Sequence, residues 1–461
     1  MKNNVVDKKA AREPACPNCG IIPAIKDANR RGFLKGVATL SAMGAVKCGS
    51  AMMPGEQAAY DKYNAMVVPR PEGLLDGEPV LQVPAPDSMG IAFAVTALSN
   101  GFAEVADNPE MKNPIRFMAD GLPLAGIDDR VILIRMTGLK PSTKYWYRAG
   151  AAKLEHPVGY WTKPSEIVWG AVHSFTTAGE NAPSHFGMMC DTHAQFEQMS
   201  RITKKYRELG VPLVVWNGDI PNSLTNKRED FVKHYLVPPH NEGYAADTPI
   251  VLNRGNHDFR GTVANRLGEV MMPRLPSERS MRDFALDRNF AFRMGELALI
   301  GLDTGEDKPD HHPANGGFSH FTKYRVAQTA WLKDQFKRPE IADARYVVAF
   351  VHIPLVEPWP GANPGTLLED YAAWQKECAD LWGPILTENR VQLVLAGHLH
   401  RYMYQAPDTT RSWAEIVGGG RGGNTFQTLV EGKVEGGELV MRVHNTDAGT
   451  IVGEHRFKPR T

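Results

Sequence analysis

Five short stretches of this chain carry acidic, amide and imidazole side chains, which are the types that bind metal ions. Each stretch follows an apolar run, and in chain order they are Asp191-Thr192-His193, Asn217-Gly218-Asp219, Gly255-Asn256-His257-Asp258, His352-Ile353-Pro354 and Gly397-His398-Leu399-His400. Carboxylate, amide and imidazole groups suit hard and borderline divalent ions. One carboxylate can bridge two ions, so seven such side chains are enough to hold a pair. Two ions about 3.5–4 Å apart polarise a phosphoryl group and generate hydroxide at neutral pH, so the set predicts phosphate-ester hydrolysis.

Each stretch alone also has a simple structural explanation. An Asp-x-His triplet occurs by chance, a Gly-Asp pair is common in turns, and a lone His352 is most simply a core histidine. The block Gly255-Asn256-His257-Asp258 is the most specific. His398 and His400 are moderately specific, because histidines two positions apart on a strand or loop can face one ion. Because every one of the five stretches follows a strand-like run, a shared metal site explains them better than five coincidences.

Alternating strands and helices are expected to position these side chains from about residue 182 onward. The pattern predicts strands at 185–190, 211–216, 250–252, 297–302, 346–351 and 391–395, and helices at 194–209, 327–336 and 371–386. Short strands with glycine turns return over 415–457. Strands alternating with helices indicate a layered α/β domain. The carboxyl ends of its strands open on the crevice where such sheets bind ligands, so the five stretches should converge there.

A β-rich module precedes this domain, with short alternating strands between about residues 81 and 179 that suggest a small β-sandwich. The run Thr137-Gly138-Leu139-Lys140-Pro141-Ser142-Thr143-Lys144-Tyr145-Trp146-Tyr147-Arg148 resembles fibronectin type III domains. It is especially similar to the N-terminal domain of purple acid phosphatases. We therefore expect a sandwich over residues 54–180 and one large catalytic domain over residues 181–461.

The order of the five stretches resembles that of the calcineurin-like metallophosphoesterases, over residues 185–459. The resemblance implies an α/β fold with two packed sheets in four αββα layers. It also implies a division of roles. Asp191, His193 and His400 would bind one metal, Asn256, His352 and His398 the other, and Asp219 would bridge them. His257 would stand beside the substrate and donate to the leaving oxygen, with Asp258 orienting its imidazole.

Two positions depart from the purple acid phosphatases. Those enzymes have glycine where this chain has His193, and a tyrosine where it has Asn222. That tyrosine gives them their colour and stabilises ferric iron. Without it we expect a colourless or weakly coloured site. Histidine at position 193 fits the wider family, which uses manganese, iron or zinc, so the resemblance implies two divalent or trivalent ions of these metals.

The first residues predict export. Arg30 and Arg31, followed by Gly32-Phe33-Leu34-Lys35 and a short apolar stretch, look like a bacterial twin-arginine signal. We expect a leader over residues 1–53 and a periplasmic or secreted protein; the bland alternative is a basic N-terminus with a chance arginine pair. Cys16 and Cys19 have the spacing of half a zinc site or a redox pair, but no second pair follows.

The composition of the chain limits the classes of binding partner that we expect. Lys plus Arg and Asp plus Glu both number 52, so bulk positive charge does not favour nucleic acid binding. No apolar run reaches the roughly 18 residues that span a membrane, so no stable membrane insertion is expected. The expected partner is a small phosphorylated substrate. The primary hypothesis is an acid phosphatase-like hydrolysis of phosphomonoesters by a metal-bridging hydroxide. The alternatives are a phosphodiesterase for small or cyclic diesters and a catalytically silent cell-surface binding protein.

Several further residues have a structural explanation beside a functional one. Cys190 is expected to be a buried strand residue rather than a nucleophile, and Arg254 to form a salt bridge rather than bind phosphate. The stretch 303–320, with His311, His312 and His320, is either a loop that contacts phosphate or a solvated surface loop. Tyr402 and Tyr404 follow the last expected ligand, and they either line the substrate pocket or lie outside it. The glycine run 418–423 resembles the turn that follows the last ligand in this family.

Overall fold

A computed structural model of the chain describes residues 73–121, 124–158, 161–222, 225–273, 286, 288–312, 315–356, 368–420 and 426–460. These residues belong to one compact unit. The expected export leader, with Cys16, Cys19 and Cys48, lies outside the described residues, as do positions 421–425 of the glycine-rich segment. Among the described residues, no helix combines the length and the apolar character needed to cross a membrane.

Two sheets packed face to face form the α/β part of the fold. The first has the strand order β24-β23-β22-β13-β14-β15, and β13, β14 and β15 run parallel. Its strands are β13 (His185–Met189), β14 (Val214–Asn217), β15 (Ile250–Asn253), β22 (Thr428–Glu435), β23 (Glu438–Asn445) and β24 (Thr450–Phe457). The second has the order β16-β17-β18-β19-β21-β20. Its strands are β16 (Phe290–Met294), β17 (Leu297–Gly301), β18 (Tyr346–Phe350), β19 (Leu393–Ala396), β20 (Met403–Gln405) and β21 (Ala414–Val417).

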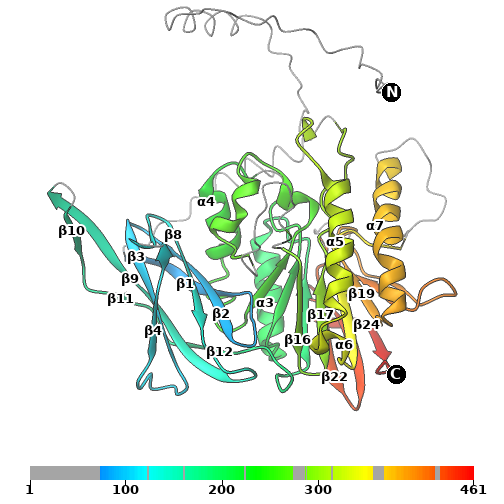
Figure 1. The fold of residues 1–461 in the computed structure, drawn as a ribbon, viewed down its shortest axis with the longest axis horizontal. Helices are drawn as coiled ribbons and strands as arrows, with labels where there is room; N and C mark the ends of the chain where they lie inside the picture. Colours follow the sequence, from blue (N-terminus) through cyan, green and yellow to red (C-terminus); the bar gives the residue numbers. More distant parts are fainter. Residues whose placement is uncertain are drawn as a thin grey trace, which may run out of the picture. The chain divides into compact units, whose positions relative to one another are not determined.

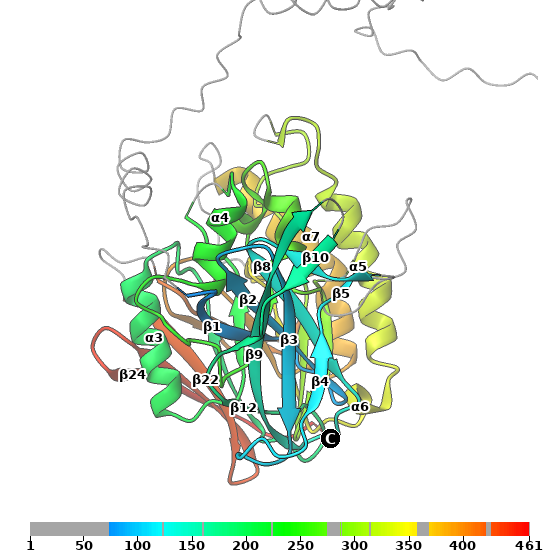
Figure 2. The same ribbon diagram turned by 90° about the vertical axis from the view of Figure 1, so that its left-hand side faces the viewer.

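Apolar side chains fill the space between these sheets, and helices cover their outer faces. Phe186 of β13 meets Phe350 of β18 edge to face, with ring centroids 5.6 Å apart. Helix α3 (Phe196–Glu208) buries Met199, Ile202 and Tyr206 against the first sheet, because their spacing places them on one helical face. Helices α5 (Phe321–Gln335) and α7 (Leu368–Glu388) cover the second sheet, on the opposite side from α3 (Figure 2). The expected four-layer arrangement is confirmed.

The N-terminal β-rich region continues the first sheet. Strands β1 (Leu75–Gln82), β2 (Ser88–Val95) and β8 (Val131–Thr137) follow β15 in the order β15-β1-β2-β8. Strand β1 runs parallel to β15, with Gln82 opposite Ile250. The structure thus joins the two expected domains through one continuous sheet that crosses the expected boundary at residue 180.

A third sheet, which has seven strands, packs on β1, β2 and β8. It contains β3 (Ser99–Ala106), β4 (Ile115–Met118), β7 (Ile127–Asp128), β9 (Lys144–Val158), β10 (Trp161–Pro164), β11 (Val168–Trp169) and β12 (His173–Thr176). Buried residues such as Ile91, Val105 and Ile132 fill the space between the layers. Figure 1 shows this sheet, with β9 and β10 reaching furthest, on the opposite side of the molecule from α5 and α7.

His173 of β12 connects this region to the segment before β15. Its Nδ1 lies 3.1 Å from Asp247 Oδ2, and its Nε2 lies 2.9 Å from Glu78 Oε2 of β1. Burial lowers the pKa of His173, but the hydrogen bonds and charges of the two carboxylates outweigh burial and raise this pKa above its ordinary value of 6.5. The bridge is therefore strongest when the imidazole is protonated.

This bridge predicts a pH dependence of stability. A raised folded-state pKa contributes stability that is complete below pH 6.5 and is lost as the pH rises through the raised value. We expect the free energy of unfolding to fall as the pH rises from 6.5 through the raised pKa of His173, and to fall less steeply in His173→Gln. The control is His311→Gln, since His311 is exposed. Urea unfolding across this pH range measures the difference, and identical slopes in all three proteins would rule the bridge out.

Candidate metal centre

The expected metal ligands all lie just beyond strand ends that meet at one edge of the two sheets. Asp191 and Asp219 stand two residues after β13 and β14, and Asn256 opens the short helix η2 (Asn256–Phe259) after β15. His352 and His398 stand two residues after β18 and β19 of the second sheet. The structure thus brings together side chains that are up to 209 positions apart, counted from Asp191 to His400.

One group of side chains surrounds the point expected for the first ion. His193 Nε2 and His400 Nε2 lie 2.9 Å apart. The same two atoms lie 3.9 Å and 3.6 Å from Asp191 Oδ1. His193 Nε2 also lies 3.6 Å from Asp219 Oδ2. One candidate donor atom from each of these four residues lies within 4.8 Å of the others, which is close enough for one ion.

A second group shares Asp219 with the first. His352 Nε2 lies 3.3 Å from Asp219 Oδ2, and donor atoms of Asp219, His352 and His398 lie within 4.8 Å of one another. Asn256 joins this group through its Oδ1, which is 2.9 Å from His398 Nδ1. The two groups divide the seven side chains as the family resemblance implies, with Asp219 between them.

The backbone around the centre is held in an unusual conformation. Five of the seven expected ligands have a positive φ, which non-glycine residues seldom adopt: Asp191 (54°), His193 (45°), Asp219 (56°), His398 (70°) and His400 (55°). Such strain persists where the surrounding structure enforces it, and it concentrates at functional sites. Gly255 leaves room for the carboxylate of Asp219, because a Cβ at position 255 would stand 2.3 Å from Asp219 Oδ1.

Burial makes the charges of these side chains interdependent. Asp191, Asp219 and His352 are at most 1% exposed. Burial raises the pKa of Asp191 to about 7. Burial alone would lower the pKa of His352, but Asp219 and Asp191 raise it to about 10.

Cations fit this set of donor atoms. Two imidazole nitrogens that face each other at 2.9 Å need a proton or a cation between them. The two buried carboxylates likewise need nearby positive charge. Imidazole, carboxylate and amide donors are those that manganese, iron and zinc accept. Asp191, His193 and His400 would hold one ion, Asn256, His352 and His398 the other, and Asp219 both.

Asp258 does not hold the imidazole of His257 as expected. Its Oδ2 accepts hydrogen bonds from the backbone N–H of Asp219 (2.9 Å) and of Gly255 (2.7 Å), and its Oδ1 accepts one from the Tyr235 hydroxyl (2.7 Å). The short helix η2 turns Asp258 back toward the preceding strand ends, so Asp258 organises the backbone that presents the carboxylate of Asp219, the expected bridging residue.

His257 lies at the edge of the centre, with its Nε2 3.9 Å from Asp219 Oδ2. Its Nδ1 donates to the carbonyl oxygen of Asn222, and its Nε2 accepts a hydrogen bond of 3.0 Å from Arg260 Nη1. A carbonyl can only accept and a guanidinium can only donate, so the ring is neutral with its proton on Nδ1. Burial, together with Arg260, lowers the pKa of His257 to about 4. In this arrangement Nε2 has no proton to donate.

Arg260 and two acidic residues beside it were missed by the sequence analysis. Glu306 Oε2 and Oε1 accept hydrogen bonds from Arg260 Nε (2.9 Å) and Nη2 (2.8 Å), and Asp307 Oδ1 accepts another from Nη2 (3.0 Å). Arg260 follows Asp258 by two positions, which was the available signal. In the stretch 303–320, His311 and His320 are exposed, whereas the acidic residues Glu306 and Asp307 contact Arg260.

Arg254, Cys190, Tyr402 and Tyr404 make structural contacts. Arg254 Nε donates to Asp303 Oδ2 at 2.7 Å, which is the expected salt bridge. Cys190 is fully buried, and burial raises the pKa of its thiol well above the ordinary value, which favours the expected structural role. Tyr402 and Tyr404 contact His455 of β24, by a 2.8 Å hydrogen bond and by ring stacking.

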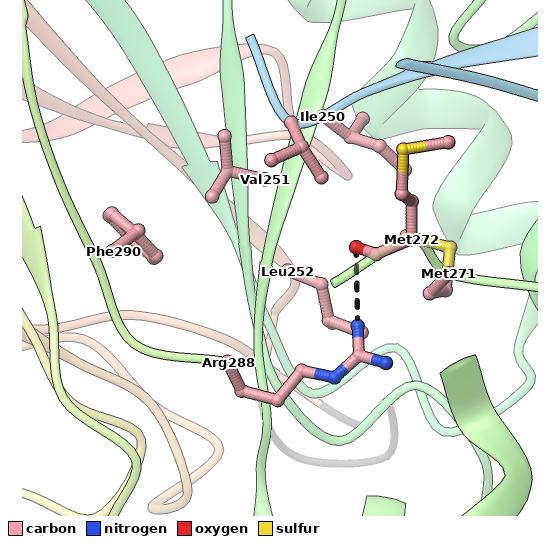
Figure 3. Close-up of a pocket in the computed structure, with 8 residues that line it drawn as sticks. Ile250, Val251, Leu252, Met271, Met272, Arg288 and Phe290 are labelled. Carbon is pink, nitrogen blue, oxygen red and sulfur yellow. Dashed lines mark hydrogen bonds between the residues drawn. The ribbon is translucent and has the colours of Figure 1, made fainter. Parts of the chain in front are cut away.

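A small pocket elsewhere in the fold contains none of the expected site residues (Figure 3). It is lined by apolar residues of β15 and by Met271 and Met272, with Arg288 Nη1 3.5 Å from the carbonyl oxygen of Met272. The side chains suited to metal and phosphate chemistry gather at the strand ends instead.

Comparison with known proteins assigns the fold. Residues 185–402 match the sequence profile of the calcineurin-like phosphoesterases, so the chain carries a domain of that family. A purple acid phosphatase from yellow lupin (Lupinus luteus) seeds has a similar structure, with a TM-score of 0.57 and 13% sequence identity. The match covers 82% of this chain and 74% of the lupin protein, and so extends into the N-terminal β-rich region. A dimetal phosphatase from Danio rerio matches with a TM-score of 0.43 and 15% identity, over 60% of this chain and 100% of its own length.

Proposed function

We propose that this protein is a dinuclear-metal phosphoesterase that hydrolyses phosphomonoesters, exported by the twin-arginine route. The observation that carries the catalytic proposal is the double group of buried donors around Asp219, at strand ends of a phosphoesterase domain. The preference for monoesters draws support from the fold shared with a purple acid phosphatase.

The residues of this chain would divide the work as follows. When bound, two metal ions would polarise the phosphoryl oxygens and lower the pKa of water toward neutrality. Asp219 would fix the distance between the two metal positions, and Asp258 would hold the backbone of Asp219 through its 2.9 Å hydrogen bond. His257 would line the substrate side and keep Arg260 in place.

A matrix of metals and substrates tests the proposal. The chelated protein is reloaded separately with manganese, iron and zinc, and turnover is measured with 4-nitrophenyl phosphate and with methyl 4-nitrophenyl phosphate. We expect hydrolysis with at least one metal, none after chelation, and a higher kcat/KM for the monoester. A higher kcat/KM for the diester would replace the monoester assignment. No turnover with any metal would favour a silent binding protein.

A further inference from the structure

We propose that Arg260 binds an unesterified phosphoryl oxygen of the substrate and thereby selects monoesters over diesters. This inference rests on the proposed function, because it assigns the substrate class of the same site. It is carried by the fixed position of the guanidinium beside the centre and by the N–H group of Nη1 that its hydrogen bond to His257 leaves over.

Two acidic side chains hold Arg260 firmly. Its Nε and Nη2 are occupied by Glu306 and Asp307, at distances between 2.8 and 3.0 Å. Glu306 is itself 5% exposed, and a buried arginine keeps the loop in place, since Arg325 Nη2 donates to the Glu306 carbonyl oxygen at 2.7 Å. A guanidinium fixed on two of its three nitrogens loses little conformational freedom when the third binds an oxygen.

The third nitrogen, Nη1, lies beside the imidazole that borders the centre. Nη1 carries two N–H groups, and its one hydrogen-bond partner in the described parts of the chain is His257 Nε2. The second N–H can therefore serve a ligand. His257 Nε2 is also 3.9 Å from Asp219 Oδ2, so the imidazole of His257 contacts both Arg260 Nη1 and the Asp219 carboxylate.

The selectivity for monoesters depends on whether the substrate oxygen that faces Nη1 can accept a hydrogen bond, and not on the net charge around Arg260. Lys308 Nζ lies 2.6 Å from Asp307 Oδ1, so Arg260 and Lys308 balance Glu306 and Asp307 when all four are ionised. A phosphomonoester has three unesterified oxygens, and two ions and one arginine can each take one. A diester has only two, so its second ester oxygen and substituent would face Nη1. An ester oxygen is a poor acceptor, and the charge-assisted bond would be lost.

Two substitutions of Arg260 and a matched control test this role. Arg260→Gln removes the charged donor, and Arg260→Lys keeps the charge without the fork. The control Arg266→Gln changes an arginine that is half exposed and paired with Glu269 at 2.6 Å. The substrates are 4-nitrophenyl phosphate and methyl 4-nitrophenyl phosphate, which share a leaving group. We expect Arg260→Gln to lower kcat/KM about 30-fold for the monoester and less than about three-fold for the diester, with Arg260→Lys in between.

A binding measurement separates this inference from the proposed function. Calorimetric titration of each metal-loaded variant with inorganic phosphate should show about 10-fold or greater weakening in Arg260→Gln and no change in Arg266→Gln. This readout does not require turnover, so it stands even if the wild-type protein hydrolyses neither ester. Metal analysis and thermal unfolding verify that the variants are folded and loaded, and Arg260→Lys carries the test if Arg260→Gln is not. Equal losses for both esters, or unchanged phosphate binding, would overturn the role of Arg260.

Discussion

Asp219→Asn should abolish hydrolysis, with a loss of at least about 10³-fold in kcat, and should reduce the bound metal to fewer than two ions per chain. Asp219 belongs to both donor groups, and its Oδ2 lies 3.3 Å from His352 Nε2 and 3.6 Å from His193 Nε2. An amide is nearly the same size but carries no charge, so it cannot balance two cations. Steady-state kinetics and elemental analysis of the same samples measure the two effects together.

The control for this variant is Asp408→Asn. Asp408 is exposed and accepts hydrogen bonds within its own turn, from Thr410 and Arg411. We expect it to keep wild-type turnover and two ions. An Asp219→Asn protein that retains both ions and hydrolyses esters at near wild-type rates would remove Asp219 from the centre.

Asp258→Ala should have the largest effect on stability, lowering the free energy of unfolding by at least about 3 kcal/mol. The substitution leaves three buried donors without their acceptor, and each lost partner costs about 1–3 kcal/mol. These donors are the backbone N–H groups of Gly255 and Asp219 and the hydroxyl of Tyr235. Urea unfolding of chelated protein measures the loss without a contribution from bound metal.

Asp258→Asn separates the hydrogen bonds from the charge. Its amide oxygen can accept the two backbone hydrogen bonds, so this variant should lose clearly less stability than Asp258→Ala. The family resemblance assigns Asp258 to the His257 imidazole, and under that role the metal-free fold would hardly change. A loss below about 1 kcal/mol in Asp258→Ala would therefore favour the imidazole role.

The strands of the two packed α/β sheets could be predicted from the sequence because they are short, apolar and followed by polar residues. The expected strands at 185–190, 250–252 and 346–351 correspond to β13, β15 and β18. The N-terminal strands were harder to predict. Strand β3 begins Ser99-Asn100-Gly101, which resembles a turn, yet it is almost entirely buried between neighbouring strands. Tertiary packing overrides local preference there.

The pairing of β1 with β15 could not be predicted from the alternation of apolar and polar residues. Alternation shows which face of a strand is buried, but it does not show which strand lies beside it. The contact depends on the pairing of Gln82 with Ile250, 168 positions apart in the sequence.

The expected ligands were predictable because each side chain is tied to the end of its own strand. The role of Asp258 was not, because the direction of its side chain depends on the turn of η2. Arg260 was missed for a related reason: its partners Glu306 and Asp307 are 46 and 47 positions away on an irregular loop. Long-range contacts that are made by loops leave no periodic signal in a sequence.

The most direct test of the account is a crystal structure of the metal-loaded protein with anomalous scattering recorded at the absorption edge of the metal. We expect two peaks about 3.5–4 Å apart. One should be surrounded by Asp191, His193 and His400, the other by Asn256, His352 and His398, with Asp219 touching both. A single ion, or ions bound away from these side chains, would contradict the proposal of a dinuclear phosphoesterase.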